Sequence, residues 1–200
     1  MTVPTAYSYP DRMGRILLAS LEEVVGRSGL QAALHLAGLD EPSDGALSFQ
    51  TIAALHEKLE QMYGPRGGRG LALRAGRVCF KYGLREFGAE MGLTENAFRL
   101  LPMPVKLRTA AQSFADLFNK QTDQIVRIEA AEGKLIWRIE RCPLCWERHA
   151  GEAICHLAVG LLQESLYWLS GGKIFNVQET QCVARGESAC VIEIDTNPLD

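Results

Sequence analysis

The chain of 200 residues combines 47% hydrophobic with 22% charged residues, a composition typical of a packed globular protein. It excludes a disordered tail, a collagen-like repeat and a membrane bundle. The net charge is −3, from 21 basic and 24 acidic residues mixed along the chain, so no basic region favours nucleic acid or an anionic membrane as a partner. A chain of this length buries roughly 70% of its extended surface. We therefore expect a single domain over residues 1–200.

Apolar residues recur at spacings of three and four through most of the first 122 residues, a pattern that predicts amphipathic helices. The expected helices cover residues 16–25, 30–36, 48–63, 70–92 and 105–119. The first two are separated at Ser28-Gly29, and Gly64-Pro65 ends the third. Glycines inside the fourth, Gly76, Gly83 and Gly88, each cost about 1 kcal/mol relative to alanine and suggest close packing.

The hydrophobic period changes after Thr122. Apolar and polar residues largely alternate over 124–129 and 134–140, and Glu132-Gly133 between them predicts a β-hairpin. A further helix is expected over 151–170, where Gly171-Gly172 ends it. Two last strands are expected over 173–183 and 189–195.

This order predicts an α+β fold, with a mainly helical part at 1–122 and a ββ-α-ββ part with an antiparallel sheet at 123–200. No apolar run is long enough to span a membrane, and the first 15 residues lack the pattern of a signal peptide. We expect a cytoplasmic protein. In that reducing compartment, cysteines are more often thiols or metal ligands than disulfides.

Five of the six cysteines lie between Cys142 and Cys190. Cys155 is expected on the first turn of a helix, Glu179 and Cys182 on one strand, and Cys190 just after a glycine turn. A helix packed over the last hairpin could bring these four side chains into a tetrahedral set of three sulfurs and one oxygen, suited to a structural Zn²⁺. The alternative is that the thiols are small buried hydrophobes and the carboxylate is solvated.

Cys142-Pro143-Leu144-Cys145 forms a Cys-x-x-Cys pair that stands unaccompanied in its stretch of sequence. In other settings such a pair is a redox disulfide, half a zinc site or part of an iron–sulfur site. We interpret it here as two ordinary thiols that a metal site does not need. Cys79, on an apolar helical face, is expected in the core.

The C-terminal third resembles the 4-vinyl reductase family domain over about 50 residues, in its order of a cysteine at 155, glycines at 171–172, Glu179-x-x-Cys182 and Gly186-x-x-x-Cys190. The resemblance implies a fold like the ligand-binding domain of NO signalling and Golgi transport proteins. It implies that zinc is bound by Cys155, Glu179, Cys182 and Cys190. It also implies an apolar cavity beside the zinc, which in phenol sensors of this family holds an aromatic effector.

The side chains expected to line such a cavity are apolar and aromatic, with one histidine beside Cys155: Phe80, Phe87, Phe114, Phe118, Trp137 and His156. No Ser-His-Asp order, carboxylate pair or His-Glu-x-x-His pattern supports hydrolytic chemistry. The glycine-rich stretch 64–70 lacks the lysine of a phosphate loop, and a dinucleotide-binding fingerprint is missing. We therefore do not expect an enzyme.

These observations leave three hypotheses. The first is a zinc-stabilised domain that binds an apolar, aromatic or tetrapyrrole ligand as a sensor, carrier or accessory factor. The second is an accessory role in the vinyl reduction step of bacteriochlorophyll biosynthesis, and the third is a dimeric scaffold without a ligand. A homodimer is expected, and a sensor would pass its signal to a downstream protein partner, because the sequence shows no output module of its own.

Overall fold

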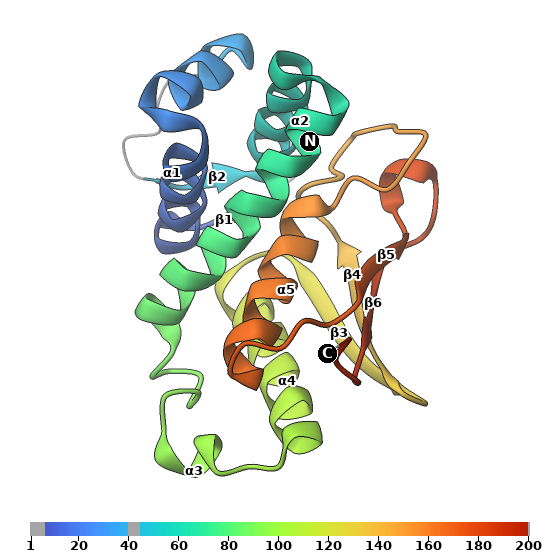
Figure 1. Cartoon of the computed structure of the whole chain (residues 1–200). Coiled ribbons are helices and arrows are strands. Elements are labelled where there is room, and N and C mark those ends of the chain that lie inside the picture. Colours follow the sequence, from blue (N-terminus) through green and yellow to red (C-terminus); the bar gives the residue numbers. More distant parts are fainter. Residues whose placement is uncertain (1–6, 40–44, 200) are drawn as a thin grey trace, which may run out of the picture.

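The computed structural model describes residues 7–39 and 45–199 (Figure 1). Residues 1–6 and 200, the two ends of the domain expected over 1–200, lie outside the described residues, as do residues 40–44. The elements in chain order are β1 (Ser8–Tyr9), α1 (Asp11–Leu36), β2 (Leu47–Ser48), α2 (Phe49–Phe87), α3 (Asn96–Arg99), α4 (Met103–Gln121), β3 (Ile125–Ala131), β4 (Lys134–Arg141), α5 (His156–Ser170), β5 (Val177–Gln181), a short 3-10 turn (Val183–Arg185) and β6 (Cys190–Asp195).

The two long helices are each bent at a glycine with positive φ. In α1 the bend is at Gly26 (φ 75°), so the break expected at Ser28-Gly29 falls inside the helix and that prediction is wrong by two residues. The cause is that glycine adopts a positive φ without steric cost. In α2 the bend is at Gly64 (φ 73°), directly before Pro65, as predicted. Proline suits the first turn after such a bend, where its missing N–H is not needed.

Helices α2 and α5 cross where each has a glycine. A Cβ added to Gly76 would lie 2.0 Å from the oxygen of Leu157, and one added to Gly160 would lie 2.1 Å from a backbone oxygen of α2. The close packing expected at Gly76 is therefore confirmed. It is wrong at Gly83, where an added Cβ would meet no atom within 4 Å. Gly88 caps the C-terminal end of α2.

Four strands form one antiparallel sheet in the order β3-β4-β6-β5, and the helices lie on one side of it (Figure 1). The predicted hairpin is confirmed, with Gly133 at its turn in positive φ (70°). Trp137 on β4 lies opposite Ile128 on β3 and Ile192 on β6. Alternate residues of β4 are buried, because that face packs against the helices. The α+β class is confirmed.

Several boundaries differ from those expected. The helix expected over 151–170 begins only at His156, so Cys155 caps its N-terminus and does not lie on its first turn. The strand expected over 173–183 is limited to β5, so Cys182 follows the strand. The two-residue strands β1 and β2 pair through Ser8 and Ser48 and were not predicted, because strands this short have no hydrophobic period.

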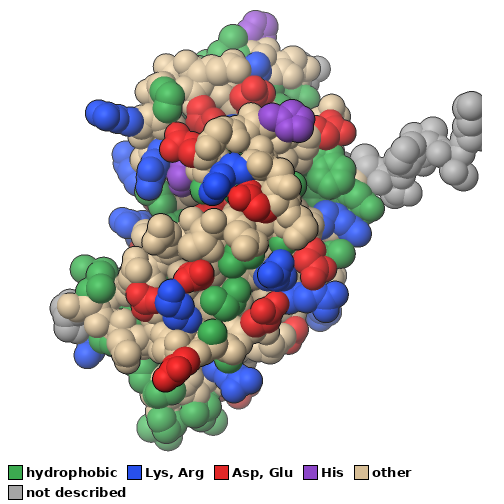
Figure 2. All heavy atoms as spheres, turned by 90° about the vertical axis from the view of Figure 1, so that its right-hand side faces the viewer, with side chains coloured by type: hydrophobic (Ala, Val, Ile, Leu, Met, Phe, Trp, Pro, Cys, Tyr) green, Lys and Arg blue, Asp and Glu red, His purple; other side chains and the backbone are tan. Residues whose placement is uncertain are grey.

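In the described part of the chain, no helix has both the length and the apolar character to cross a membrane. On the face shown in Figure 2, basic and acidic side chains are interspersed, and no extended patch of one sign appears there. Surfaces of this kind lack the electrostatic footprint of a nucleic-acid-binding face.

Candidate metal centre and ligand cavity

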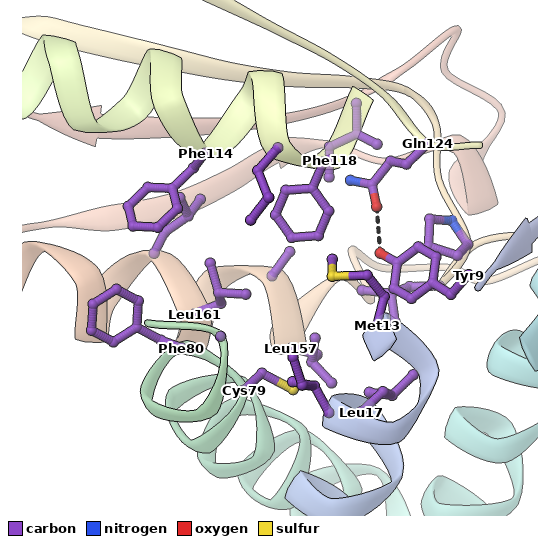
Figure 3. Close-up of a pocket in the computed structure, with 18 of the residues that line it drawn as sticks. Tyr9, Met13, Leu17, Cys79, Phe80, Phe114, Phe118, Gln124, Leu157 and Leu161 are labelled. Carbon is purple, nitrogen blue, oxygen red and sulfur yellow. Dashed lines mark hydrogen bonds between the residues drawn. The ribbon is translucent and has the colours of Figure 1, made fainter. Parts of the chain in front are cut away.

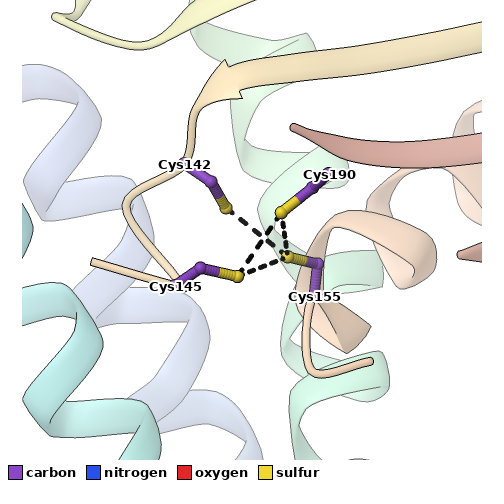
Figure 4. Close-up of side chains that lie close together, drawn as sticks. All are labelled: Cys142, Cys145, Cys155 and Cys190. Carbon is purple, nitrogen blue, oxygen red and sulfur yellow. Dashed lines mark hydrogen bonds between the residues drawn. The ribbon is translucent and has the colours of Figure 1, made fainter. Parts of the chain in front are cut away.

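Five cysteine thiols meet at one buried point, which we call the thiol cluster: Cys142, Cys145, Cys155, Cys182 and Cys190. The Sγ atom of Cys145 lies 3.2 Å from that of Cys155, 3.4 Å from that of Cys182 and 3.5 Å from that of Cys190. The Cys155 sulfur also lies 3.4 Å from Cys142 and 3.5 Å from Cys190 (Figure 4). All five side chains are at most 3% exposed.

Each thiol comes from the end of an element rather than its middle. Cys142 follows β4, Cys155 caps α5, and Cys182 follows β5. The chain turns back at Gly186, whose φ of 99° strongly favours glycine, and Cys190 then opens β6. The cluster therefore gathers three loop ends at one edge of the sheet beside the start of α5.

Glu179 on β5 lies beside the cluster with a carboxylate oxygen that has no partner. Its Oε2 accepts a 2.7 Å hydrogen bond from the backbone N–H of Cys155, whereas its Oε1 is buried and makes no hydrogen bond. Burial raises the pKa of this carboxyl to about 9. An unpaired buried carboxylate oxygen is costly unless a proton or a cation satisfies it. The residue therefore fits the role of an oxygen ligand.

Hydrogen bonds from neighbouring groups favour a thiolate at Cys190. Its sulfur accepts from the backbone N–H of Val183 at 3.3 Å, and hydrogen bonds from the surrounding thiols, first that of Cys142, lower its pKa. Burial raises the pKa of the Cys142 thiol. Metal ligation requires thiolates, and outer contacts of this kind orient and stabilise them.

Two sets of four side chains are each arranged closely enough for one metal ion. The first is the set expected from the sequence, Cys155, Glu179, Cys182 and Cys190, and the second is Cys142, Cys145, Cys155 and Cys190. Within each set, the ligand atoms all lie within 4.8 Å of one another. The buried cysteine cluster can therefore hold a metal ion.

The Cys-x-x-Cys pair is not unaccompanied, and that part of the sequence interpretation is wrong. The motif itself was the available signal. What could not be read from it is that the chain folds back after β4 and places Cys145 against Cys190, which lies 45 residues further along the chain. Cys79 is buried and belongs to neither set of ligands, as expected.

A cavity of about 80 Å³ lies between the helices and the inner face of the sheet. All five aromatic side chains expected there line it: Phe80, Phe87, Phe114, Phe118 and Trp137 (Figure 3). His156 does not, which corrects its expected position. Helix α5 turns Leu157, Ala158, Leu161 and Leu162 toward the cavity, and His156, one residue before this face, lies instead near Arg69, Glu152 and Arg148.

The cavity has one polar end. The hydroxyl of Tyr9 donates a 2.5 Å hydrogen bond to Oε1 of Gln124, and both residues line the cavity (Figure 3). Gln124 is only 6% exposed. Burial raises the pKa of the Tyr9 phenol, so this group stays a neutral hydrogen-bond donor. Sequence reasoning missed both residues, because β1 was not predicted.

The thiol cluster and the cavity share a wall. Cys142, Pro143 and Leu144 all line the cavity, and the Cys142 sulfur is at the same time 3.4 Å from that of Cys155. The segment between β4 and Cys145 therefore has one side toward the apolar space and the other toward the thiols.

Residues 135–196 match the family model of the 4-vinyl reductase domain. This C-terminal part of the chain belongs to the 4-vinyl reductase family. The match contains nearly all of β4, the whole of α5, β5 and β6, and all five cysteines of the thiol cluster. It agrees with the resemblance seen in the sequence. No curated protein matches the chain in sequence.

Solved H-NOX structures share the fold of nearly the whole chain. An H-NOX protein from S. oneidensis in the Fe(II)NO state is 12% identical with a TM-score of 0.60, and the alignment covers 92% of this chain and 98% of that one. An oxygen-binding H-NOX domain related to soluble guanylate cyclases is 13% identical with a TM-score of 0.58, covering 96% and 97%. A Cs H-NOX mutant is 13% identical with a TM-score of 0.61, covering 95% and 98%. The 4-vinyl reductase segment thus lies within an H-NOX-like fold.

Proposed function

We propose that this chain is a ligand-binding domain that takes up a compact apolar or aromatic molecule in the cavity between helices and sheet. The observation that carries the proposal is the cavity itself. Its lining is almost wholly apolar and comes from α1, α2, α4, α5 and β4. A space enclosed by side chains from both halves of the fold is the usual form of a small-molecule site.

The size and the polar end of the cavity restrict the ligand. An apolar cavity of about 150 Å³ holds benzene, so about 80 Å³ suits a small ring only after modest side-chain movement. A tetrapyrrole is far larger. The Tyr9–Gln124 pair supports a ligand with one hydroxyl or carbonyl group, because the Gln124 amide group has hydrogen atoms left to donate.

Haem, which one of the structurally similar proteins contains, does not fit this cavity. None of the histidines of the described chain lines it, and its volume is a small part of what a porphyrin needs. These two features support a compact colourless ligand over the tetrapyrrole role, and over the accessory role in vinyl reduction.

The same proposal includes a zinc ion held by Cys155, Glu179, Cys182 and Cys190. The arrangement of these ligand atoms and the unpaired Oε1 of Glu179 support it. Four protein ligands leave no open position, so the ion would be structural. When bound, it would tie the loop after β5, the start of β6 and the start of α5 together.

The test of ligand binding is a variant that fills the cavity without disturbing the helix. Gly83 lines the cavity, and a Cβ added to it meets no atom within 4 Å. Gly83→Leu is therefore expected to fold and to melt no lower than the wild type. Gly70→Leu is the matched control, since Gly70 lies in the same helix with equal space around it but away from the cavity.

The measurement is a melting-temperature screen of phenols, other small aromatics, fatty acids and porphyrins, with quenching of tryptophan fluorescence as the second readout. A ligand at 100 times its dissociation constant adds roughly 2.7 kcal/mol to stability. We expect small phenols to stabilise the wild type and Gly70→Leu, but not Gly83→Leu. If no compound raises the midpoint of the wild type, the scaffold hypothesis replaces this one.

A homodimer and a downstream protein partner remain further parts of the proposal. Exposed apolar side chains on α5 and the segment after it, Tyr167 and Ile174, are 52% and 57% exposed. Light scattering of the purified chain with and without ligand is the direct test of the oligomeric state.

A further inference from the structure

The thiol cluster contains more ligands than one ion can use. Cys155 and Cys190 belong to both tetrahedral sets, Glu179 and Cys182 complete one set, and the Cys-x-x-Cys pair completes the other. Together these are six donor side chains at one buried point. A four-coordinate ion leaves two of them over.

We propose that the cluster is a binuclear centre, in which a second ion is held by Cys142, Cys145, Cys155 and Cys190, and the thiolates of Cys155 and Cys190 bridge the two ions. This inference rests on the proposed zinc site and extends it. The second set is made of sulfur alone, so it favours thiophilic ions such as Zn²⁺ or Cd²⁺.

Burial and charge support the second ion. Cys142 and Cys145 are 3% and 1% exposed, so neither thiol is available to solvent. A divalent cation carries two positive charges, and ionising these two thiols adds two negative charges. The second ion together with its two added thiolates therefore brings no further net charge into the interior, where uncompensated charge is costly.

The competing explanation is that Cys142 and Cys145 stay protonated and donate S–H hydrogen bonds to a metal-bound Cys155. The sulfur distances of 3.4 Å and 3.2 Å to Cys155 fit that explanation as well. The two explanations differ in the number of ions bound, which is directly measurable.

The experiment is anaerobic loading of the full-length, reduced, metal-free chain with Zn²⁺ or Cd²⁺, followed by native mass spectrometry and cadmium NMR. We expect two ions per chain and two cadmium resonances that are mutually coupled through the shared thiolates. The double variant Cys142→Ser Cys145→Ser is expected to keep one ion. Cys79→Ser, which changes the cysteine outside the cluster, is expected to keep two.

One ion in the wild type overturns the proposal, whichever variant is compared. If the double variant then keeps that ion, the pair only donates hydrogen bonds, and if it loses the ion, the pair ligates the sole ion. A wild type that binds no metal shows that the proposed zinc site itself is wrong, whereas ligand binding in the cavity is scored separately. Circular dichroism of the double variant shows whether it is folded, and the wild-type count is independent of that variant.

Discussion

At the scale of single residues, buried polar atoms without hydrogen-bond partners lie close to the candidate site. Oε1 of Glu179 faces the thiol cluster, and Nε2 of His56 is buried in α2 near Arg148. Arg148 in turn pairs with Glu60 at 2.6 Å. A buried polar atom left unpaired costs about 1–3 kcal/mol, so both residues are expected to affect stability or binding measurably.

Glu179→Gln is expected to lower zinc affinity at least about tenfold, a loss that changes around metal sites commonly produce. The amide keeps an acceptor for the Cys155 N–H but removes the charge that attracts the ion. Competition with a chromophoric chelator measures the change. Glu193→Gln on the neighbouring strand β6 is the control, because its carboxylate pairs with Lys134 at the surface. Unchanged affinity in Glu179→Gln would mean that a thiol, such as that of Cys145, occupies the fourth position.

His56 is expected to make stability depend on acid pH. Burial lowers its pKa to about 3, against 6.5 for the free side chain. The unfolded chain therefore takes up a proton below pH 6.5 that the folded chain refuses, so stability falls as the pH falls from 6.5 toward 3. The loss reaches roughly 5 kcal/mol at most, at 1.36 kcal/mol per pKa unit.

The measurement is the denaturant midpoint at several pH values in wild type and His56→Gln. The variant is expected to show a flatter dependence between pH 6.5 and 4. His156, whose pKa is lowered to about 4 chiefly by burial, contributes in the same direction and remains in both proteins. His149→Gln, at an exposed position, is the control. Parallel curves for wild type and His56→Gln would show that His56 is not the source.

At the scale of elements, the crossing of α2 and α5 holds the walls of the cavity at a fixed distance. Leu157, Leu161 and Leu162 on α5 face Phe80 on α2 across this space. The helices approach so closely at Gly76 and Gly160 that a side chain there would meet backbone atoms rather than movable side chains. Backbone oxygens cannot move aside without unwinding a helical turn.

Gly160→Ala is therefore expected to destabilise the fold by at least about 2 kcal/mol, within the usual cost of overpacking. Gly70→Ala is the control. Its added Cβ meets no atom within 4 Å, so the variant is expected to gain up to about 1 kcal/mol from helix propensity. Urea unfolding of both variants gives the comparison, and equal midpoints would show that the helices separate at little cost.

At the scale of the whole molecule, the thiol cluster and the cavity are linked by their shared wall, Cys142 to Leu144. A metal that fixes Cys142 also fixes one side of the ligand site. By linkage, the effect is reciprocal: if metal raises ligand affinity, ligand raises metal affinity by the same factor.

Removing the metal with a chelator is expected to weaken ligand binding about fivefold or more, as typical coupling energies imply. It is also expected to loosen residues 142–155 and 182–190 while much of the helical part stays folded, because metal binding and local folding are coupled. Hydrogen exchange with and without chelator measures the second effect. Uniform protection in both states would show that the cluster stabilises nothing beyond itself.

Local patterns in the sequence determined most of the elements of this protein. The alternation over 124–140 predicted the hairpin, since every second side chain of a strand faces the same side. Gly64-Pro65 predicted the bend in α2, and the Glu179-x-x-Cys182 and Cys190 pattern indicated the 4-vinyl reductase segment before its geometry was known. Each of these signals lies within a few residues, where covalent geometry and hydrophobic period act directly.

Contacts between distant segments were decided only by the tertiary structure. Cys142 and Cys145 could not be assigned to the cluster from spacing, because their nearest sulfur partners are 10 to 45 residues away. Tyr9 reaches Gln124 across 115 residues through a two-residue strand that has no period. His156 looked like a cavity residue beside Cys155, but the point at which α5 begins turns it away. Hydrophobic period determines which face of an element is buried, whereas the packing of all the elements together determines which side chains meet there.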